Sequence, residues 1–203
     1  AWGIAKACAD AGAELAFSYQ GEALLKRVNP LAAQLGSSLV LPCDVGDEAS
    51  MDALFAELQK EWGQLDFVVH AIGFSDKNEL RGRYVDTSRD NFTMTMDISV
   101  YSFTAIMQRA EKMMSAGGSA LTLTYYGAEQ VMPHYNVMGV AKAALESSVR
   151  YLANDLGPDG IRQISEMAVL NANYIKASLR DCYHLPYPGP SLHEVVFNDK
   201  EQL

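Results

Sequence analysis

Short apolar runs alternate along this chain with longer segments of helical periodicity, and this alternation limits the possible folds more than any other feature. The apolar runs lie at 14–19, 38–43, 65–70 and 119–124, and the helical patterns at 1–11, 22–35, 48–62, 88–114 and 134–156. Strands separated by crossover helices pair in parallel, with helices on both faces of the sheet. We therefore expect an α/β fold, with Asp47 as the cap of the third helix.

The composition is that of a single domain of 203 residues with a net charge of −9. An acidic chain is repelled by nucleic acid and by anionic membranes, so we expect neither as a partner. No window of about 18 apolar residues predicts a membrane span, and no signal peptide is visible, so a cytoplasmic protein is expected. The amino terminus reads as incomplete. The three cysteines are widely spaced, which favours buried reduced thiols over a disulfide framework or a metal site.

Tyr135 and Lys142 form the most suggestive pair of side chains in the sequence. Seven residues make about two helical turns, which would place both on one face, roughly 10 Å apart. A phenol that donates to a developing oxyanion, beside an ammonium group, suits the reduction of an activated carbonyl. Spacing alone leaves the alternative of a half-buried tyrosine next to a solvated lysine.

The string from Tyr125 to Lys142 resembles the active-site segment of the bacterial enoyl-[acyl-carrier-protein] reductases, a divergent branch of the short-chain dehydrogenases. Further matching segments follow in order at 1–5, 17–20, 43–45, 70–74, 97–103 and 157–162. The resemblance implies a Rossmann-like doubly wound parallel sheet and an oxidoreductase of fatty-acid synthesis. It further implies NADH as cofactor, an enoyl substrate linked to acyl-carrier protein, and a homotetramer.

The same resemblance implies roles for three catalytic residues. Tyr135 would donate to the enolate oxygen formed when hydride reaches the β-carbon of a trans-2-enoyl thioester. Lys142 would hold the ribose hydroxyls next to the nicotinamide, and Tyr125 would help to shape the pocket. Taken without the resemblance, Tyr125 reads equally well as a tyrosine at a strand edge.

The cofactor residues implied by the resemblance follow three predicted strands, at the carboxyl edge where such sheets bind ligands. They are Gln20, Asp44, Val45, Ala71, Ile72 and Gly73, together with Lys142. Ordinary turn or capping residues would look the same at several of these positions. His70 ends an apolar strand and is interpreted as a packed, hydrogen-bonded side chain rather than a catalytic group.

Two departures from the family pattern affect the expected sheet. Family members place an apolar strand and a glycine-rich loop before the helix with which this chain begins, so we expect a gap between the strands at 14–19 and 65–70. The pattern also stops near Arg162, so the final strands of the family sheet are expected to be missing. Polar groups bordering such a gap are costly to bury.

The remaining segment, 163–203, resembles a fragment of the pyridoxal-phosphate-dependent glycine decarboxylases, from which no activity is carried over. We therefore divide the chain into a partial Rossmann-like domain at 1–162 and a foreign or divergent tail. His184 and His193 lack companions at ligand spacing, so no metal site is expected. The function hypothesis is an impaired enoyl reductase; the alternative is a non-catalytic truncated or fused product that retains part of a nucleotide site.

Overall fold

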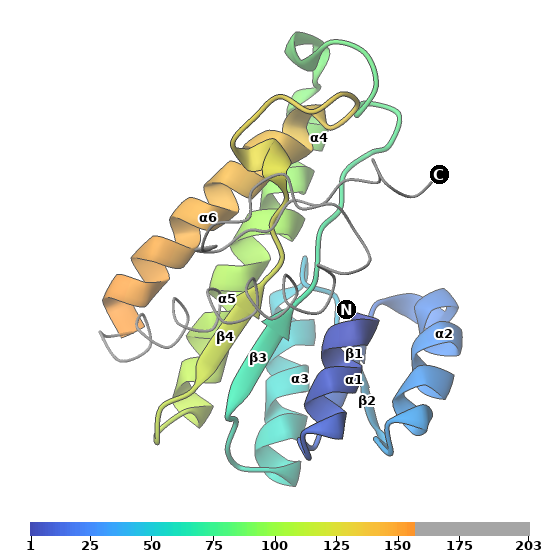
Figure 1. The fold of residues 1–203 in the computed structure, drawn as a ribbon, viewed down its shortest axis with the longest axis vertical. Helices are drawn as coiled ribbons and strands as arrows, with labels where there is room; N and C mark the ends of the chain where they lie inside the picture. Colours follow the sequence, from blue (N-terminus) through green and yellow to red (C-terminus); the bar gives the residue numbers. More distant parts are fainter. Residues whose placement is uncertain (157–203) are drawn as a thin grey trace, which may run out of the picture.

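The computed structural model describes residues 1–156. Six α-helices are present in this part: α1 (Trp2–Asp10), α2 (Gly21–Gln34), α3 (Glu48–Glu61), α4 (Arg89–Met96), α5 (Ser102–Ala110) and α6 (Asn136–Leu156). Four strands alternate with them: β1 (Ala16–Tyr19), β2 (Leu39–Pro42), β3 (Phe67–His70) and β4 (Ser119–Thr122). Each strand lies within a predicted apolar run, so the α/β alternation is confirmed (Figure 1).

The strands pair as two separate parallel ladders. β1 pairs with β2, with Ala16 opposite Leu39, and β3 pairs with β4, with Phe67 opposite Ser119. No ladder joins β1 to β3 within the described residues. The partial sheet with a break between these two strands is the arrangement that the sequence predicted.

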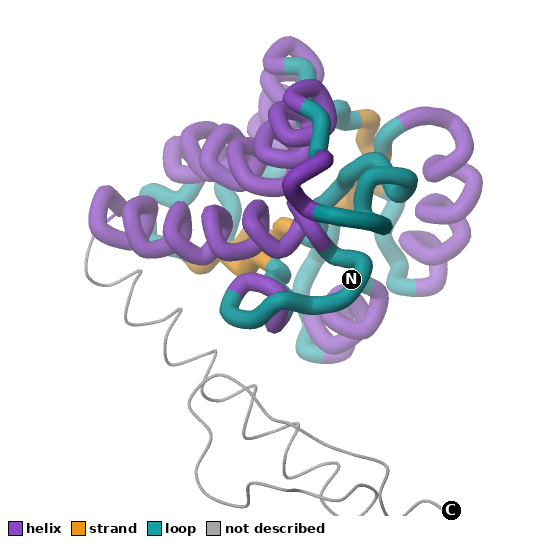
Figure 2. Tube along the Cα trace, turned by 90° about the horizontal axis from the view of Figure 1, so that it is seen from above, coloured by secondary structure: helices purple, strands orange, loops and turns teal. Residues whose placement is uncertain are grey.

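Helices α3 and α5 supply most of the core between the sheet and one layer of helices. Met51 and Phe55 of α3 pack in one cluster with Phe103 and Ile106 of α5. Figure 2 shows helices on both sides of the strands, as expected for a doubly wound fold. Cys43 is buried and free, whereas Cys8 is free but only partly buried, contrary to the expectation of a buried thiol.

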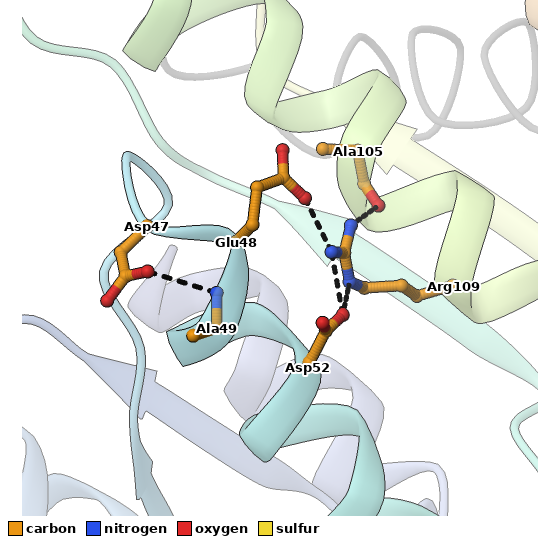
Figure 3. A network of polar contacts seen from close by, with 6 residues as sticks. All are labelled: Asp47, Glu48, Ala49, Asp52, Ala105 and Arg109. Atoms are coloured by element: carbon orange, nitrogen blue, oxygen red, sulfur yellow. Dashed lines mark hydrogen bonds and ion pairs between the residues drawn. The ribbon is translucent and has the colours of Figure 1, made fainter.

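Polar contacts fix the beginning of α3 and its position against α5 (Figure 3). The Asp47 side chain accepts a hydrogen bond of 3.0 Å from the Ala49 amide, which confirms the predicted cap. Arg109 of α5 donates to Glu48 at 2.6 Å and to Asp52 at 2.7 Å. Because both carboxylates are largely exposed, these ion pairs stabilise the fold only modestly.

Two predicted helices differ in detail from the structure. The segment 88–114 is helical almost throughout, but a π-helix (Asp97–Tyr101) separates α4 from α5. The last helix begins at Asn136 rather than His134, because His134 and Asn136 have positive φ angles of 61° and 36°. Tyr135 therefore precedes α6, and its carbonyl accepts a hydrogen bond from the Met138 amide. The assumption that Tyr135 and Lys142 share one helix was wrong.

Candidate active site

Lys142 lies at the carboxyl ends of β3 and β4, where α6 crosses the loops that follow both strands. Its side chain is buried, at 8% exposure, and Nζ donates a hydrogen bond of 2.8 Å to the Leu123 carbonyl oxygen. A Cβ atom at Gly73 would sit 3.6 Å from Nζ. The Gly73 backbone therefore lies close beside the ammonium group, and the structure brings these two predicted residues together.

Burial and charge set the protonation states around Lys142. Loss of solvent lowers the pKa of Lys142 below its ordinary value. His70 is 1% exposed and hydrogen bonded to Thr122 Oγ1 at 2.9 Å and Ser102 Oγ at 2.8 Å. Burial first, and the nearby charge of Lys142 second, lower the pKa of His70 to about 4. His70 is therefore a neutral, packed residue, as the sequence indicated.

Tyr125 and Tyr135 meet edge to face, with ring centroids 4.8 Å apart and an angle of 64° between the rings. Burial, followed by the influence of Tyr125, raises the pKa of Tyr135 above its usual value. The phenol consequently keeps its proton at neutral pH and remains a hydrogen-bond donor. Gly127 makes room for it, because a Cβ there would lie 2.5 Å from a carbon of the Tyr135 ring.

The remaining predicted residues separate into two groups. Gln20 follows β1, and its side-chain amide donates a 3.0 Å hydrogen bond to Asp44, which follows β2. Val45 packs against the hydrophobic core beside them. Ile72 also packs against the core, whereas Ala71 is exposed.

Ser99 of the π-helix is a site residue that our reading of the sequence missed. Its hydroxyl is fully buried, donates to the Phe74 carbonyl oxygen and accepts from the Phe74 amide, both at 3.0 Å. These bonds hold the segment that follows Gly73. One sequence signal could have identified it: Ser99 and Ser102 are three residues apart in an apolar helical segment, so they lie on the same face of the helix. We know of no sequence signal for the π-helix, although such segments often occur at functional sites.

The arrangement offers a phenol donor, a buried ammonium group and a backbone turn without a side chain at one edge of the sheet. No hydrogen bond joins Tyr135 to Lys142 in residues 1–156: Lys142 bonds to the Leu123 carbonyl oxygen, and Tyr135 packs against Tyr125. Groups of three potential metal ligands are absent from the same residues. Nor does any helix in the described part have the length and apolar character needed to cross a membrane.

Comparison with known proteins identifies the family. The family model described as "Enoyl-(Acyl carrier protein) reductase" matches residues 1–166. Enoyl-[acyl-carrier-protein] reductase [NADH] 1 of Rhizobium meliloti is 70% identical over 162 residues, which cover 80% of this chain and 60% of that protein. The FabI protein of Rickettsia bellii is 55% identical over 161 residues, covering 79% of this chain and 62% of that one.

Solved structures agree with this assignment. The reductase of Anaplasma phagocytophilum, crystallised in complex with NAD, is 64% identical and superposes with a TM-score of 0.75 over 77% of this chain and 60% of that chain. FabI of Candidatus Liberibacter asiaticus gives the same TM-score at 57% identity, over 76% of this chain and 60% of the other. The chain thus spans about 60% of the length of these relatives. On the fold, the site geometry and these matches together, the chain belongs to the enoyl-[acyl-carrier-protein] reductase family.

Proposed function

We propose that this chain carries out the reduction of a trans-2-enoyl thioester on acyl-carrier protein with NADH. The observation that carries the proposal is the contact of the buried Lys142 ammonium group with the turn at Gly73, in a chain where the Tyr135 phenol keeps its proton. The names of the relatives support the choice of cofactor, since the Rhizobium protein is named for NADH and the Anaplasma structure contains NAD.

The two groups of predicted residues suit the two ends of a dinucleotide. Gln20, Asp44 and Val45 lie at the ends of β1 and β2 and would contact the adenosine end. The backbone at 71–73 and Lys142 lie at the end of β3 and would hold the nicotinamide ribose. The missing Cβ at Gly73 allows the close approach that such contact requires. When bound, NADH supplies the hydride.

In the proposed reaction, hydride forms a new C–H bond at the β-carbon of the substrate, and the double-bond electrons move onto the thioester oxygen. Tyr135 donates a hydrogen bond to that oxygen, where a single preorganised donor commonly contributes about 10²-fold or more in rate. A proton from solvent finally adds to the α-carbon as the electrons return from the oxygen, which completes the saturated thioester. Tyr125 packs on the Tyr135 ring and holds it in position.

The organisation of the whole chain is also a proposal. We infer a reductase domain at 1–162 and a separate tail at 163–203 related to glycine decarboxylase; the tail lies outside the described residues. A cytoplasmic location and a family-type homotetramer follow from the same relationship. We expect turnover by a polypeptide limited to residues 1–203 to be impaired, because it includes no glycine-rich loop for the pyrophosphate. The non-catalytic alternative is less favoured, since the relatives that match the chain are named as enoyl reductases.

The test is an assay of NADH oxidation with an enoyl thioester, together with calorimetric titration of NADH. A polypeptide limited to residues 1–203 should bind NADH weakly and show slow, substrate-dependent oxidation. Tyr135→Phe should lower the rate on the order of 10²-fold, whereas Tyr126→Phe, a neighbouring exposed phenol outside the ring pair, should not. Equal rates in both variants would remove Tyr135 from the mechanism, and no oxidation at any NADH concentration would favour the non-catalytic alternative.

A further inference from the structure

Asn136 has a backbone conformation that is rare for a residue with a side chain. Its φ angle is 36° and that of His134 is 61°, so two left-handed residues flank Tyr135. This conformation is unfavourable for residues other than glycine, although asparagine and histidine adopt it more often than most. It persists where surrounding contacts hold it, and it is most common at functional sites. The contacts of Asn136 therefore bear on the position of Tyr135.

The side-chain amide of Asn136 makes two of these contacts. Its Nδ2 donates to the Glu79 carbonyl oxygen at 3.2 Å and to the Gly82 carbonyl oxygen at 3.4 Å. Only the NH₂ end of the amide can donate to two carbonyl oxygens, so chemistry fixes the orientation of the side chain. Both acceptors belong to the segment 71–88 between β3 and α4, which lies beside the start of α6 (Figure 1). We call this pair of bonds the Asn136 clasp.

The segment between β3 and α4 is itself bonded to the beginning of α4. The Glu79 carboxylate accepts from the Ser88 amide at 2.9 Å and from the Ser88 hydroxyl at 2.8 Å. Nearer to β3, Oδ1 of the buried Asn91 accepts a 3.0 Å bond from the Asp76 amide. These bonds hold the segment at two points, so the carbonyl groups of the clasp have defined positions.

The contacts of the Tyr135 ring do not by themselves fix the phenol. The ring meets Tyr125 at a centroid distance of 4.8 Å, and a Cβ at Gly127 would lie 2.5 Å from one of its carbons. These contacts confine the ring, whereas the direction of its hydroxyl also depends on where the backbone carries it. That backbone is held by the clasp at the next residue and by the bond from the Met138 amide to the Tyr135 carbonyl oxygen.

We propose that Asn136 is a positioning residue, which fixes the backbone at Tyr135 through the clasp and so directs the phenol toward the reacting oxygen. This inference rests on the proposed function, which assigns the phenol to the thioester oxygen. Asn136 itself contacts neither substrate nor cofactor in this mechanism. Its loss should therefore lower kcat and leave the KM for NADH unchanged, because the groups assigned to the cofactor are elsewhere. Misplacing a catalytic group by about 1 Å can lower a rate by about 10²-fold.

The test compares Asn136→Asp and Asn136→Gly in the full chain. Aspartate keeps the size of the side chain and tolerates left-handed backbone but cannot donate, whereas glycine relieves the backbone and has no side chain. Both should lower kcat roughly tenfold at an unchanged KM for NADH. The matched control, Asn78→Asp, adds the same charge at an exposed position of the segment 71–88 and should keep the parent kcat. Full kcat in Asn136→Gly would overturn the proposal, because the backbone angle alone would then matter.

Hydrogen exchange gives a second measurement that does not depend on turnover. The Met138 amide donates to the Tyr135 carbonyl oxygen at 2.9 Å, so its exchange reports on the backbone that the clasp holds. Both Asn136 variants should speed exchange at Met138 roughly tenfold, because the local opening becomes easier. Exchange at Ala141, further along α6, should stay as in the parent chain. Unchanged exchange at Met138 would overturn the proposal, whatever the activity.

Tyr135→Phe separates this inference from the proposed function. When Asn136→Asp is combined with Tyr135→Phe, the rate should fall no further than in Tyr135→Phe alone, because Asn136 acts through the phenol. A further fall in the double variant would overturn the inference, since Asn136 would then act by another route. A parent-like rate in Tyr135→Phe alone would refute the proposed role of the phenol, while exchange at Met138 would still show whether the clasp holds the backbone.

Discussion

The β3–β4 region and the β1–β2 region are both parallel strand pairs that end in predicted site residues. They differ in whether the polar side chains at those ends are buried or exposed to solvent. At the end of β3 and β4, His70, Ser99 and Lys142 are buried and hydrogen bonded. At the end of β1 and β2, Gln20 and Asp44 form an exposed hydrogen bond. Burial shifts the pKa values of side chains and holds them in a fixed geometry, as proton and hydride transfer require. Exposed polar groups are better suited to recognising a polar ligand.

The largest expected difference between the regions is in catalysis. Lys142→Met should lower the reductase rate on the order of 10²-fold or more. In the proposed mechanism the Lys142 ammonium group holds the nicotinamide ribose, and methionine cannot make this contact. Burial lowers the pKa of Lys142, so the charged form is disfavoured in the folded state and its loss should not unfold the protein. Steady-state rates and urea unfolding test both parts. An unchanged rate would place Lys142 among structural residues.

His70 predicts a pH effect confined to the β3–β4 region. Its folded pKa of about 4 lies below the ordinary value of 6.5, so folding favours the neutral ring. This stability is present above pH 6.5 and is lost as the pH falls from 6.5 toward 4, by about 2 kcal/mol between pH 7 and pH 5. Urea unfolding across this range measures it. The His70→Asn variant should show a flatter pH dependence, and an equally steep one would assign the effect to other groups.

Gly127 tests the packing of the phenol. Gly127→Ala should destabilise the fold by about 1–3 kcal/mol, since the added Cβ would lie 2.5 Å from the Tyr135 ring. Gly3→Ala in α1 is the matched control, because no atom lies within 4 Å of its Cβ position. That change should stabilise the helix by about 0.5–1 kcal/mol. Thermal unfolding that ranks the two variants in the reverse order would contradict the packing seen at Gly127.

The smallest effect is expected in the β1–β2 region. Gln20→Ala removes an exposed hydrogen bond to Asp44, so the free energy of unfolding should change by less than about 0.5 kcal/mol. The KM for NADH should rise severalfold while kcat is retained, because Gln20 contacts only the adenosine end in the proposal. A fall in kcat without a change in KM would contradict the division of labour between the two regions.

Local sequence signals predicted the elements of this fold well. The apolar runs located all four strands of the described part. Asp47 marked the start of α3, because its side chain caps the helix by a hydrogen bond to the nearby Ala49 amide. The predicted gap between β1 and β3 was also confirmed. The start of α6 was wrong by two residues, because the positive φ angles at His134 and Asn136 depend on how the preceding loop packs.

For the site residues too, the sequence predicted the local features but not the contacts between distant positions. The motif from Tyr125 to Lys142 and the glycine after β3 were visible as residue types at recognisable intervals. Their interactions were not, because they join positions far apart in the chain. Ser99 meets Phe74 across 25 residues, and His70 meets Thr122 across 52.

The sequence by itself determined the order and type of the elements, since periodicity and capping act over a few neighbouring residues. It also identified the chemical groups that the family mechanism requires. Only the tertiary structure decided which of these groups are buried. The low pKa of His70 and the burial of Lys142 both arise where separate elements remove water from the same polar groups.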